Sequence, residues 1–310
     1  MSFKLLIGTF AIILLFPLVT VPGDTLLISS TSNLNQTRVN PYDESNNDNL
    51  LGLNILTNSL ENRLYGAASI LEFASNLSEM KSVPNASLLN ATLEKLHGIP
   101  QYSDLQKRNI AQEIISHYPE IAGIAFIMPN GDTYFMEPYT LQNNQTKNNL
   151  AYRDYFKGAL ATNNTYLGDI ITSTSSGVKR SIIAVPVFSE RGNGDLTGIL
   201  VGSIDLGLLN KELESFNLSQ GQRIVYVDSN HTKIADSDKR LFTNSSESFS
   251  SLKSFQNAIE GKFGSTVEKI NQDKMLVSYY PMDALQNRWI VLWMQPLSNI
   301  NDNSNKSLAE

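Results

Sequence analysis

An arginine stands among aromatic residues in the stretch AYRDYFKGAL, residues 151–160. A guanidinium is a planar, permanently charged group that matches a carboxylate through two parallel hydrogen bonds, so Arg153 could hold an acidic ligand. The alternative is an ordinary surface arginine, with its methylene groups along neighbouring rings and its charge in water. The stretch is predicted to form a short helix whose apolar face holds Tyr152, Tyr155, Phe156 and Ala159. Arg153 falls at the margin of that face, and the residue pattern leaves both interpretations open.

A carboxylate ends a second stretch, ILVGSID, which is otherwise apolar and closes with Asp205. An unpaired carboxylate in an apolar setting is costly, so Asp205 is expected at the solvent-exposed end of a strand or paired with a cation. The cation would be a group of a ligand held between Arg153 and Asp205, or it would be Arg153 itself. In the second case neither residue would mark a functional site.

The composition excludes several classes of protein. The chain has 310 residues, 41% hydrophobic and 17% charged, which is enough to bury a core in one large or two modest globular domains. A net charge of −6 and a pI near 5.2 leave no basic surface for nucleic acid, so no nucleic-acid partner is expected. Cysteine is absent, which excludes disulfides, thiolate catalysis and cysteine-based zinc sites.

No pattern of catalytic or metal-binding residues stands out. The three histidines, His97, His117 and His231, are far apart in the sequence and none stands at metal-ligand spacing from another His or Glu. A Gly-x-Ser-x-Gly nucleophile elbow is also missing. The sequence therefore predicts a protein that is not an enzyme, with no catalytic residue, no metal ligand and no cofactor.

The N-terminus indicates export. Residues 5–21 form a run of seventeen uncharged residues after Lys4, at the lower limit for a membrane span and the upper limit for a signal peptide. No Ala-x-Ala cleavage site follows, which favours an uncleaved anchor over residues 1–23. The chain is expected on the extracytoplasmic face of the cell membrane, or secreted if the segment is cleaved. Ten Asn-x-Ser/Thr sequons give weak support for a glycoprotein: Asn35, Asn76, Asn85, Asn90, Asn144, Asn163, Asn217, Asn230, Asn244 and Asn305.

A long helix follows a polar linker, residues 24–48. Leucines and alanines repeat at steps of three and four, which predicts a helix over 49–79 as the spine of a segment that reaches residue 104. A second helix is predicted to open with a capping box at Ser103–Gln106 and to end before Pro119.

The strand pattern then occurs twice. Each pass is predicted as two strands, a helix and three strands, with a short helix after Asp205 joining the passes. The first pass has strands at 121–129, 132–138, 165–174, 180–188 and 196–206, and the second at 222–228, 232–237, 264–270, 274–282 and 288–296. The repetition predicts an α+β fold made of two tandem modules, each an antiparallel sheet with flanking helices.

The chain resembles the double Cache family of extracellular ligand-sensing domains. The resemblance covers about residues 48–296 and rests on the order of the long helix, IAGIAFIMPNGDTYF, YRDYFKGA, GDIITSTSSGVKRSIIAVPVF and GILVGSIDLGLL. It implies a long N-terminal helix that supports two PAS-like modules. The first module, 105–206, would be membrane-distal, the second module, 207–296, membrane-proximal, and residues 297–310 a disordered tail.

The resemblance also implies a site. The branch of the family that binds amino acids has an arginine in the distal module, which Arg153 matches, and an aspartate on a late strand, which Asp205 matches. Tyr155 stands where that branch usually has Trp, Phe156 where it has Tyr, and Asn148 where it has another Tyr. A phenyl ring packs but cannot form a hydrogen bond, so a grip on a carboxylate through Arg153 is better supported than recognition of an α-amine. The ligand-binding candidates are Arg153, Tyr155, Phe156 and Asp205.

The expected function is extracytoplasmic sensing or binding of a small, carboxylate-bearing molecule, such as an amino or organic acid, in the distal module. The expected partners are that ligand, the membrane through the N-terminal segment, and a separate signalling or transport protein, because no output module follows residue 296. Two alternatives are a surface protein that captures a solute for a transporter and a structural surface glycoprotein with a degenerate pocket.

Overall fold

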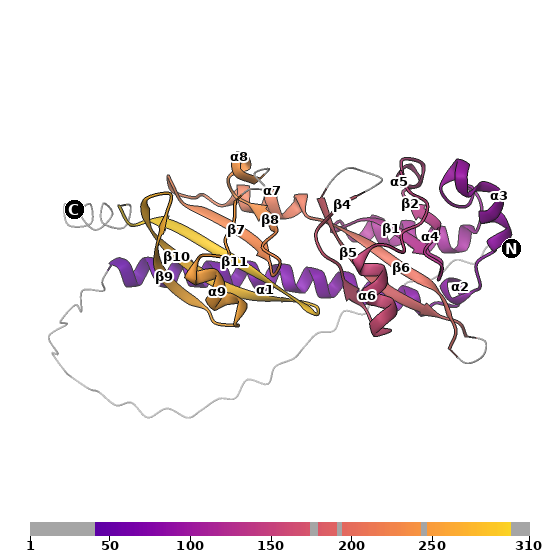
Figure 1. Cartoon of the computed structure of the whole chain (residues 1–310), viewed down its shortest axis with the longest axis horizontal. Helices are drawn as coiled ribbons and strands as arrows, with labels where there is room; N and C mark the ends of the chain where they lie inside the picture. Colours follow the sequence, from indigo (N-terminus) through magenta and orange to yellow (C-terminus); the bar gives the residue numbers. More distant parts are fainter. Residues whose placement is uncertain (1–40, 174–178, 191–193, 243–246, 299–310) are drawn as a thin grey trace, which may run out of the picture. The chain divides into compact units, whose positions relative to one another are not determined.

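The structure of the chain is a computed structural model that describes residues 41–173, 179–190, 194–242 and 247–298 (Figure 1). The apolar stretch 5–21, most of the polar linker and nearly all of the tail lie outside these residues. None of the helices in the described ranges combines the length and the apolar character needed to cross a membrane. The described residues all belong to one compact unit, 39–310.

The long helix α1 spans Pro41–Ser75, starting and ending earlier than the predicted 49–79. Its end has a local cause. The side chains of Ser75 and Asn76 donate to the carbonyl oxygen of Glu72, at 2.7 and 3.0 Å, and compete with further helical hydrogen bonds. The buried face of α1 is formed at the predicted steps of three and four by Leu53, Leu56, Leu60, Leu64, Ala67 and Leu71.

Three shorter helices connect α1 to the first sheet: α2 (Ser78–Lys81), α3 (Ala86–Leu96) and α4 (Leu105–His117). The predicted capping box at Ser103–Gln106 is wrong. Asp104 precedes α4 in a left-handed conformation, with φ of 48°, and no side chain caps the helix. The carboxylate of Asp104 instead accepts a hydrogen bond from the Tyr134 hydroxyl at 3.1 Å and lies 3.7 Å from Nζ of Lys107.

The first module contains one antiparallel sheet. Its strands follow the order β2-β1-β6-β5-β3, and β4 pairs with β5. Its elements are β1 (Ile121–Ile127), β2 (Thr133–Glu137), α5 (Tyr139–Asn143), α6 (Asp154–Thr162), β3 (Tyr166–Leu167), β4 (Ile171–Thr172), β5 (Lys179–Phe188) and β6 (Leu196–Asp205). The strand predicted at 165–174 is thus two short strands that both pair with β5.

The second module repeats this arrangement in its own sheet, with the order β8-β7-β11-β10-β9. Its elements are α7 (Gly207–Ser215), β7 (Arg223–Asp228), β8 (Lys233–Asp236), α8 (Lys239–Phe242), α9 (Lys253–Ile259), β9 (Gly264–Ile270), β10 (Asp273–Ala284) and β11 (Asn287–Pro296). The predicted α+β fold with two tandem modules is confirmed. The module boundaries at residues 105–206 and 207–296 stay predictions.

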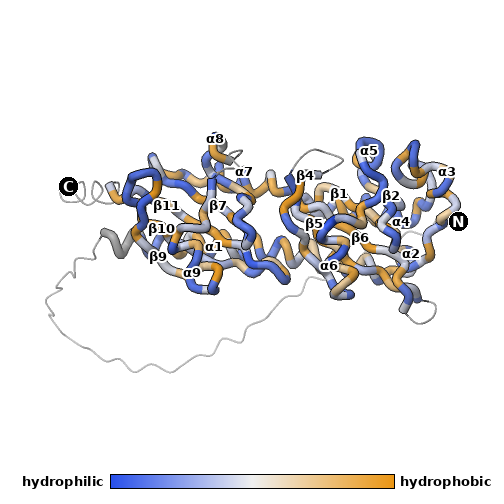
Figure 2. The backbone as a smooth tube through the Cα atoms, viewed as in Figure 1, coloured by the Kyte–Doolittle hydropathy of each residue, from blue (hydrophilic) through white to orange (hydrophobic). Residues whose placement is uncertain are grey.

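Strand periodicity divides the first sheet into two apolar faces. Phe126, Ile183 and Leu200 point to the side where α1 packs. Gly202 allows α1 to come close, because a Cβ at this position would lie 2.5 Å from Cδ1 of Leu71. The alternate residues, such as Val201, face α6 on the other side. Figure 2 shows the hydrophobic residues running along the strands and α1.

Several hydrogen bonds join the two modules. The side chain of Gln286, in the β10–β11 turn, accepts from the backbone N–H of Leu167 at 3.0 Å and donates to its carbonyl oxygen at 2.6 Å. Asn230, in the β7–β8 turn, donates to Asp169 at 2.9 Å. The N–H of Asp169 in turn donates to the carboxylate of Asp154, at the start of α6, at 2.6 Å. The start of α6 is therefore linked to the second module through Asp169.

Candidate ligand-binding site

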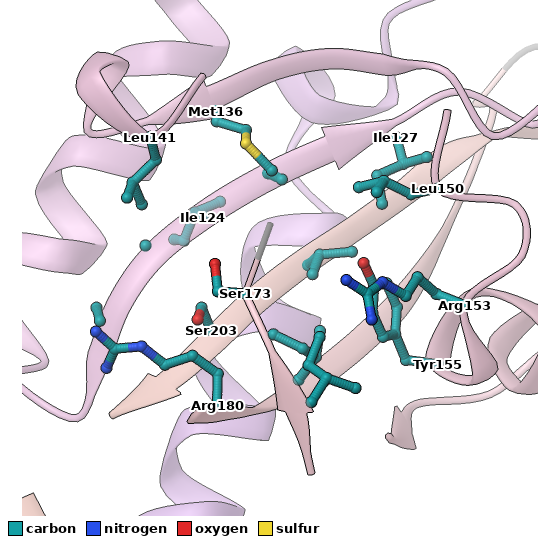
Figure 3. A pocket seen from close by; sticks show the side chains of 16 residues that line it. Ile124, Ile127, Met136, Leu141, Leu150, Arg153, Tyr155, Ser173, Arg180 and Ser203 are labelled. Atoms are coloured by element: carbon teal, nitrogen blue, oxygen red, sulfur yellow. The ribbon is translucent and has the colours of Figure 1, made fainter. Parts of the chain in front are cut away.

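A cavity of about 70 Å³ lies on the α6 side of the first sheet. Side chains of Ile124, Ile127, Met136, Leu150 and Ile182 give it largely apolar walls. Its polar groups come from Arg153, Tyr155, Ser173, Arg180 and Ser203. Figure 3 shows Arg153 and Tyr155 at one end and Arg180 at the other, with the two serines between them.

Arg153 lies directly before α6 rather than on it, so its predicted helical position is wrong. Its backbone is extended, with φ of −69° and ψ of 143°. This conformation turns the side chain toward the sheet, where its guanidinium points into the cavity (Figure 3). The predicted place of Tyr152 on the apolar face of this helix is also wrong, because the helix begins at Asp154 and Tyr152 lies outside it. Tyr152 is 44% exposed, and the centroid of its ring lies 5.0 Å from Cζ of Arg153.

Tyr155 is buried in the first turn of α6 and lines the cavity beside Arg153. Burial raises the pKa of its phenol, so the hydroxyl is protonated at neutral pH and can donate a hydrogen bond. Gly168 makes room for this residue, because a Cβ there would lie 2.8 Å from Cβ of Tyr155. Phe156 is buried in the apolar cluster between α6 and the sheet and is not among the residues that line the cavity.

Asp205 pairs with Arg180, a residue that the sequence analysis did not select. The two residues are direct partners across β5 and β6, with Nη1 of Arg180 2.7 Å from Oδ1 of Asp205. The same oxygen accepts a hydrogen bond from the N–H of Gly207 at 2.9 Å. Arg180 lines the cavity and Asp205 does not. The expected cation beside Asp205 is therefore another arginine of the chain.

Strand alternation contained a signal for Arg180. In β5, Arg180 stands at steps of two before Ile182 and Ala184, which belong to the apolar cluster under α6. In β6, Asp205 stands at steps of two after Val201 and Ser203. Residues two apart share a face of a strand, so both charges belong to the side of the sheet where the cavity lies.

The described residues that line the cavity include two arginines, two serines and a tyrosine, but no carboxylate and no histidine. Such a set can bind and orient an anion. It offers no second titratable group to exchange a proton with a substrate. No group of three or more His, Cys, Asp or Glu side chains arranged to hold a metal occurs among the described residues of the chain.

Comparison with known proteins identifies the family. A family model described as a Cache domain, of the double type, matches residues 38–304. The chain belongs to the double Cache family. The resemblance inferred from the sequence is thereby confirmed. No curated protein matches the chain.

Solved double Cache structures share the fold. The ligand-binding domain of the Pseudomonas fluorescens chemoreceptor CtaA, in complex with L-isoleucine, is similar with a TM-score of 0.58 and 12% identity over 84% of this chain and 96% of that one. The ligand-binding domain of the Pseudomonas aeruginosa chemoreceptor PctC, in complex with GABA, has a TM-score of 0.56 and 15% identity over 81% of this chain and 99% of that one. The sensory domain of the Campylobacter jejuni chemoreceptor Tlp3, with isoleucine bound, has a TM-score of 0.58 and 14% identity over 84% of this chain and 96% of that one.

Proposed function

We propose that this protein is an extracytoplasmic sensing domain whose first module holds a small, carboxylate-bearing molecule. Membership of the double Cache family supports a sensing role. The structural neighbours named above are chemoreceptor domains in complex with amino acids, all of which carry a carboxylate. The observation that carries the proposal is the guanidinium of Arg153 pointing into a cavity with mostly apolar walls.

Arg153 and Tyr155 would bind the carboxylate together. Both line the same end of the cavity, and the protonated Tyr155 hydroxyl adds a donor to the guanidinium N–H groups. A hydrogen bond to a charged group contributes about 1.5–3 kcal/mol, and more of that strength is retained where water is excluded. The aliphatic side chains of the walls would contact the rest of the ligand. Phe156 would act through packing, as part of the cluster that holds α6 on the sheet.

Signalling would follow from a difference in ligand affinity between two arrangements of the first module. A ligand that binds Arg153 would draw the start of α6 toward the sheet. Asp154 is the next residue, and its carboxylate accepts from the Asp169 N–H, whose side chain contacts Asn230 of the second module. A shift of α6 would therefore reach the second module through residues in direct contact.

The cellular setting belongs to the same proposal. Residues 1–23 would anchor the chain in the membrane or direct its secretion, and a separate signalling or transport protein would receive the signal. Protease added to intact cells is expected to degrade the chain, and cell fractionation is expected to place it with the membranes or the medium. Recovery of the intact full-length chain in the cytosol would contradict this part of the proposal.

Ligand-dependent thermal unfolding of the purified full chain tests the binding site. In a panel of amino acids, organic acids and amines, at least one carboxylate should raise the unfolding midpoint, because a ligand that binds only the folded state stabilises it by about 2.7 kcal/mol at one hundred times its Kd. Arg153→Ala should abolish the response. Lys157→Ala, a charge removal on the exposed side of α6, should leave it unchanged.

Two outcomes would contradict the proposal. If Arg153→Ala responds as the wild type does, Arg153 is not the carboxylate contact. If no carboxylate shifts the midpoint of the wild type, the degenerate pocket of a structural protein is the better description.

A further inference from the structure

The cavity has a second arginine at the end opposite Arg153. Arg180 lies at the start of β5, its side chain is only 13% exposed, and it lines the cavity (Figure 3). Nη1 of Arg180 is buried and lies 2.7 Å from Oδ1 of Asp205, but makes no well-aligned hydrogen bond. Attraction between the charges thus holds the pair together. Nη1 is covered by protein atoms, so the other N–H groups of the Arg180 guanidinium are the donors for an oxygen atom of a ligand at this end of the cavity.

The charged side chains among the described lining residues are both cationic, Arg153 and Arg180. Both arginines stay charged at any physiological pH. Asp205 is fixed at the strand end by Arg180 and by the N–H of Gly207, and it does not line the cavity. The described lining therefore favours an anionic ligand over a zwitterion.

The described side chains that line the cavity include no carboxylate to bind an ammonium group. An ammonium group is best bound by a carboxylate, and the described lining side chains that can accept a hydrogen bond are the hydroxyls of Tyr155, Ser173 and Ser203. Asp205 is not among the lining residues, and Arg180 takes its place at that end. With its carboxylate on Arg153, an amino acid would direct its ammonium toward a second cation.

The cavity is small, with a volume of about 70 Å³. This volume favours a small carboxylic acid over a large one.

We infer that the cavity selects small monocarboxylates that lack an ammonium group, such as 2-hydroxy or 2-oxo acids, and that the Arg180–Asp205 pair sets this preference. The inference rests on the proposed function. The carboxylate binds Arg153, and an uncharged oxygen of the ligand faces Arg180. Arg180 is thus a specificity-determining residue, because its charge disfavours an ammonium group while its N–H groups donate to a hydroxyl or carbonyl oxygen of the ligand.

Calorimetric titration of the full chain with matched ligands tests the inference. L-Lactate and L-alanine share a skeleton and differ by a hydroxyl and an ammonium, and the pair 2-hydroxyisovalerate and valine does the same at larger size. Lactamide lacks the carboxylate. The hydroxy acid of at least one pair is expected to bind ten-fold or more tightly than its amino acid, and lactamide is expected not to bind.

Substitutions of Arg180 and Asp205 test whether the charge of Arg180 sets the ligand preference. Arg180→Gln removes one positive charge and frees Asp205, so the preference for the hydroxy acid should fall ten-fold or more. Lys179→Gln removes the same charge from the neighbouring residue of β5, which is not among the lining residues, and should not change the preference. Asp205→Asn raises the site charge, so its hydroxy-acid preference should be as large as in the wild type or larger. This variant tests the inference independently if Arg180→Gln does not fold.

The outcomes distinguish the two proposals. If amino acids bind as tightly as their hydroxy analogues and Arg153→Ala abolishes both, the inference is overturned and the carboxylate site stands. An unchanged preference in Arg180→Gln also overturns the inference. If none of these small acids binds but another carboxylate raises the unfolding midpoint of the wild type, only the inference fails; if no carboxylate has any effect, both proposals fail.

Discussion

Replacement of Arg108 by methionine should destabilise the first module strongly. Arg108 lies on α4 and is 1% exposed. Its Nη1 lies 2.5 Å from Oε1 of Glu137, which is 2% exposed, and its other N–H groups donate to Gln142 and to backbone carbonyls, including that of Met136. Met136 lines the cavity, so this network holds one wall of the candidate site in place.

The loss can be worked out from what the substitution leaves behind. Methionine has a similar length but no charge and no donor. Glu137 would keep a hydrogen bond from Gln112 at 3.1 Å and would lose its charge partner. Breaking a buried ion pair from one side costs about 3–5 kcal/mol, because the remaining charge is uncompensated. At about 2–4 °C per kcal/mol, the unfolding midpoint should fall by roughly 6–20 °C.

Thermal and urea unfolding, followed by circular dichroism, would measure the loss. Adding Glu137→Gln to Arg108→Met should restore part of the stability, because the uncompensated carboxylate is then absent. Arg240→Met is the matched control, since Arg240 forms an ion pair with Asp238 but its side chain is 88% exposed, and little change is expected. An Arg108→Met variant as stable as Arg240→Met would refute the reasoning.

Other substitutions test the junction and the packing of α1. Gln286→Ala removes two of the hydrogen bonds to the Leu167 backbone and leaves the one from Asn287; we expect a loss of about 1–3 kcal/mol in calorimetric unfolding, and an unchanged transition would contradict this. Burial, together with a neighbouring carboxylate, raises the pKa of Asp169. The folded chain therefore binds a proton at Asp169 more tightly than the unfolded chain does. At neutral pH the ionised Asp169 lowers the stability of the fold. This loss disappears as the pH falls to the pKa of an ordinary aspartate, where Asp169 is protonated in the folded chain. Asp169→Asn should therefore raise the unfolding midpoint more at pH 7 than near pH 4, and an equal change at both would disprove the assignment. Gly202→Ala places a methyl group 2.5 Å from Cδ1 of Leu71, which should cost about 1–3 kcal/mol in urea unfolding, and a neutral effect would show that α1 moves freely.

The repeated fold could be predicted because its signals are local. Alternating apolar residues mark the strands of both sheets, and the stripe of leucines marks α1. The errors fall where contacts distant in sequence decide the conformation. The capping box at Ser103–Gln106 fails because Asp104 bonds to Tyr134, on a strand thirty residues away. The start and end of α1 also differ from the prediction, and its end is set by side chains that bond to the backbone.

The candidate site could be predicted only in part. Residue type singled out Arg153 and Asp205, and the structure places Arg153 at the cavity. The partner of Asp205 depends on the register between β5 and β6, which pairs it with Arg180. A single sequence does not give that register, because it depends on how the turn between the strands is built. Phe156 was selected from the resemblance, and its position in the apolar cluster supports a packing role.

The second module supplies an internal comparison for the site. The helix α9 holds the place in the second module that α6 holds in the first, and both helices pack against their sheets. Arg153 precedes α6 as its N-terminal cap residue, and Leu252 precedes α9 in the same position. Three residues further on, Phe156 and Phe255 correspond, and both are buried in the cluster between helix and sheet.

The correspondence separates structural residues from candidates for function. An aromatic ring at the third position of the helix occurs in both modules, so the fold itself requires it for packing. A charge at the cap position occurs in one module only. In the second module Leu252 packs against an apolar cluster that includes Phe249 and Phe255, whereas in the first module Arg153 stands at a cavity. Packing requirements shared by the two modules therefore do not explain Arg153, and the proposed contact with a carboxylate gives this residue a role that packing does not.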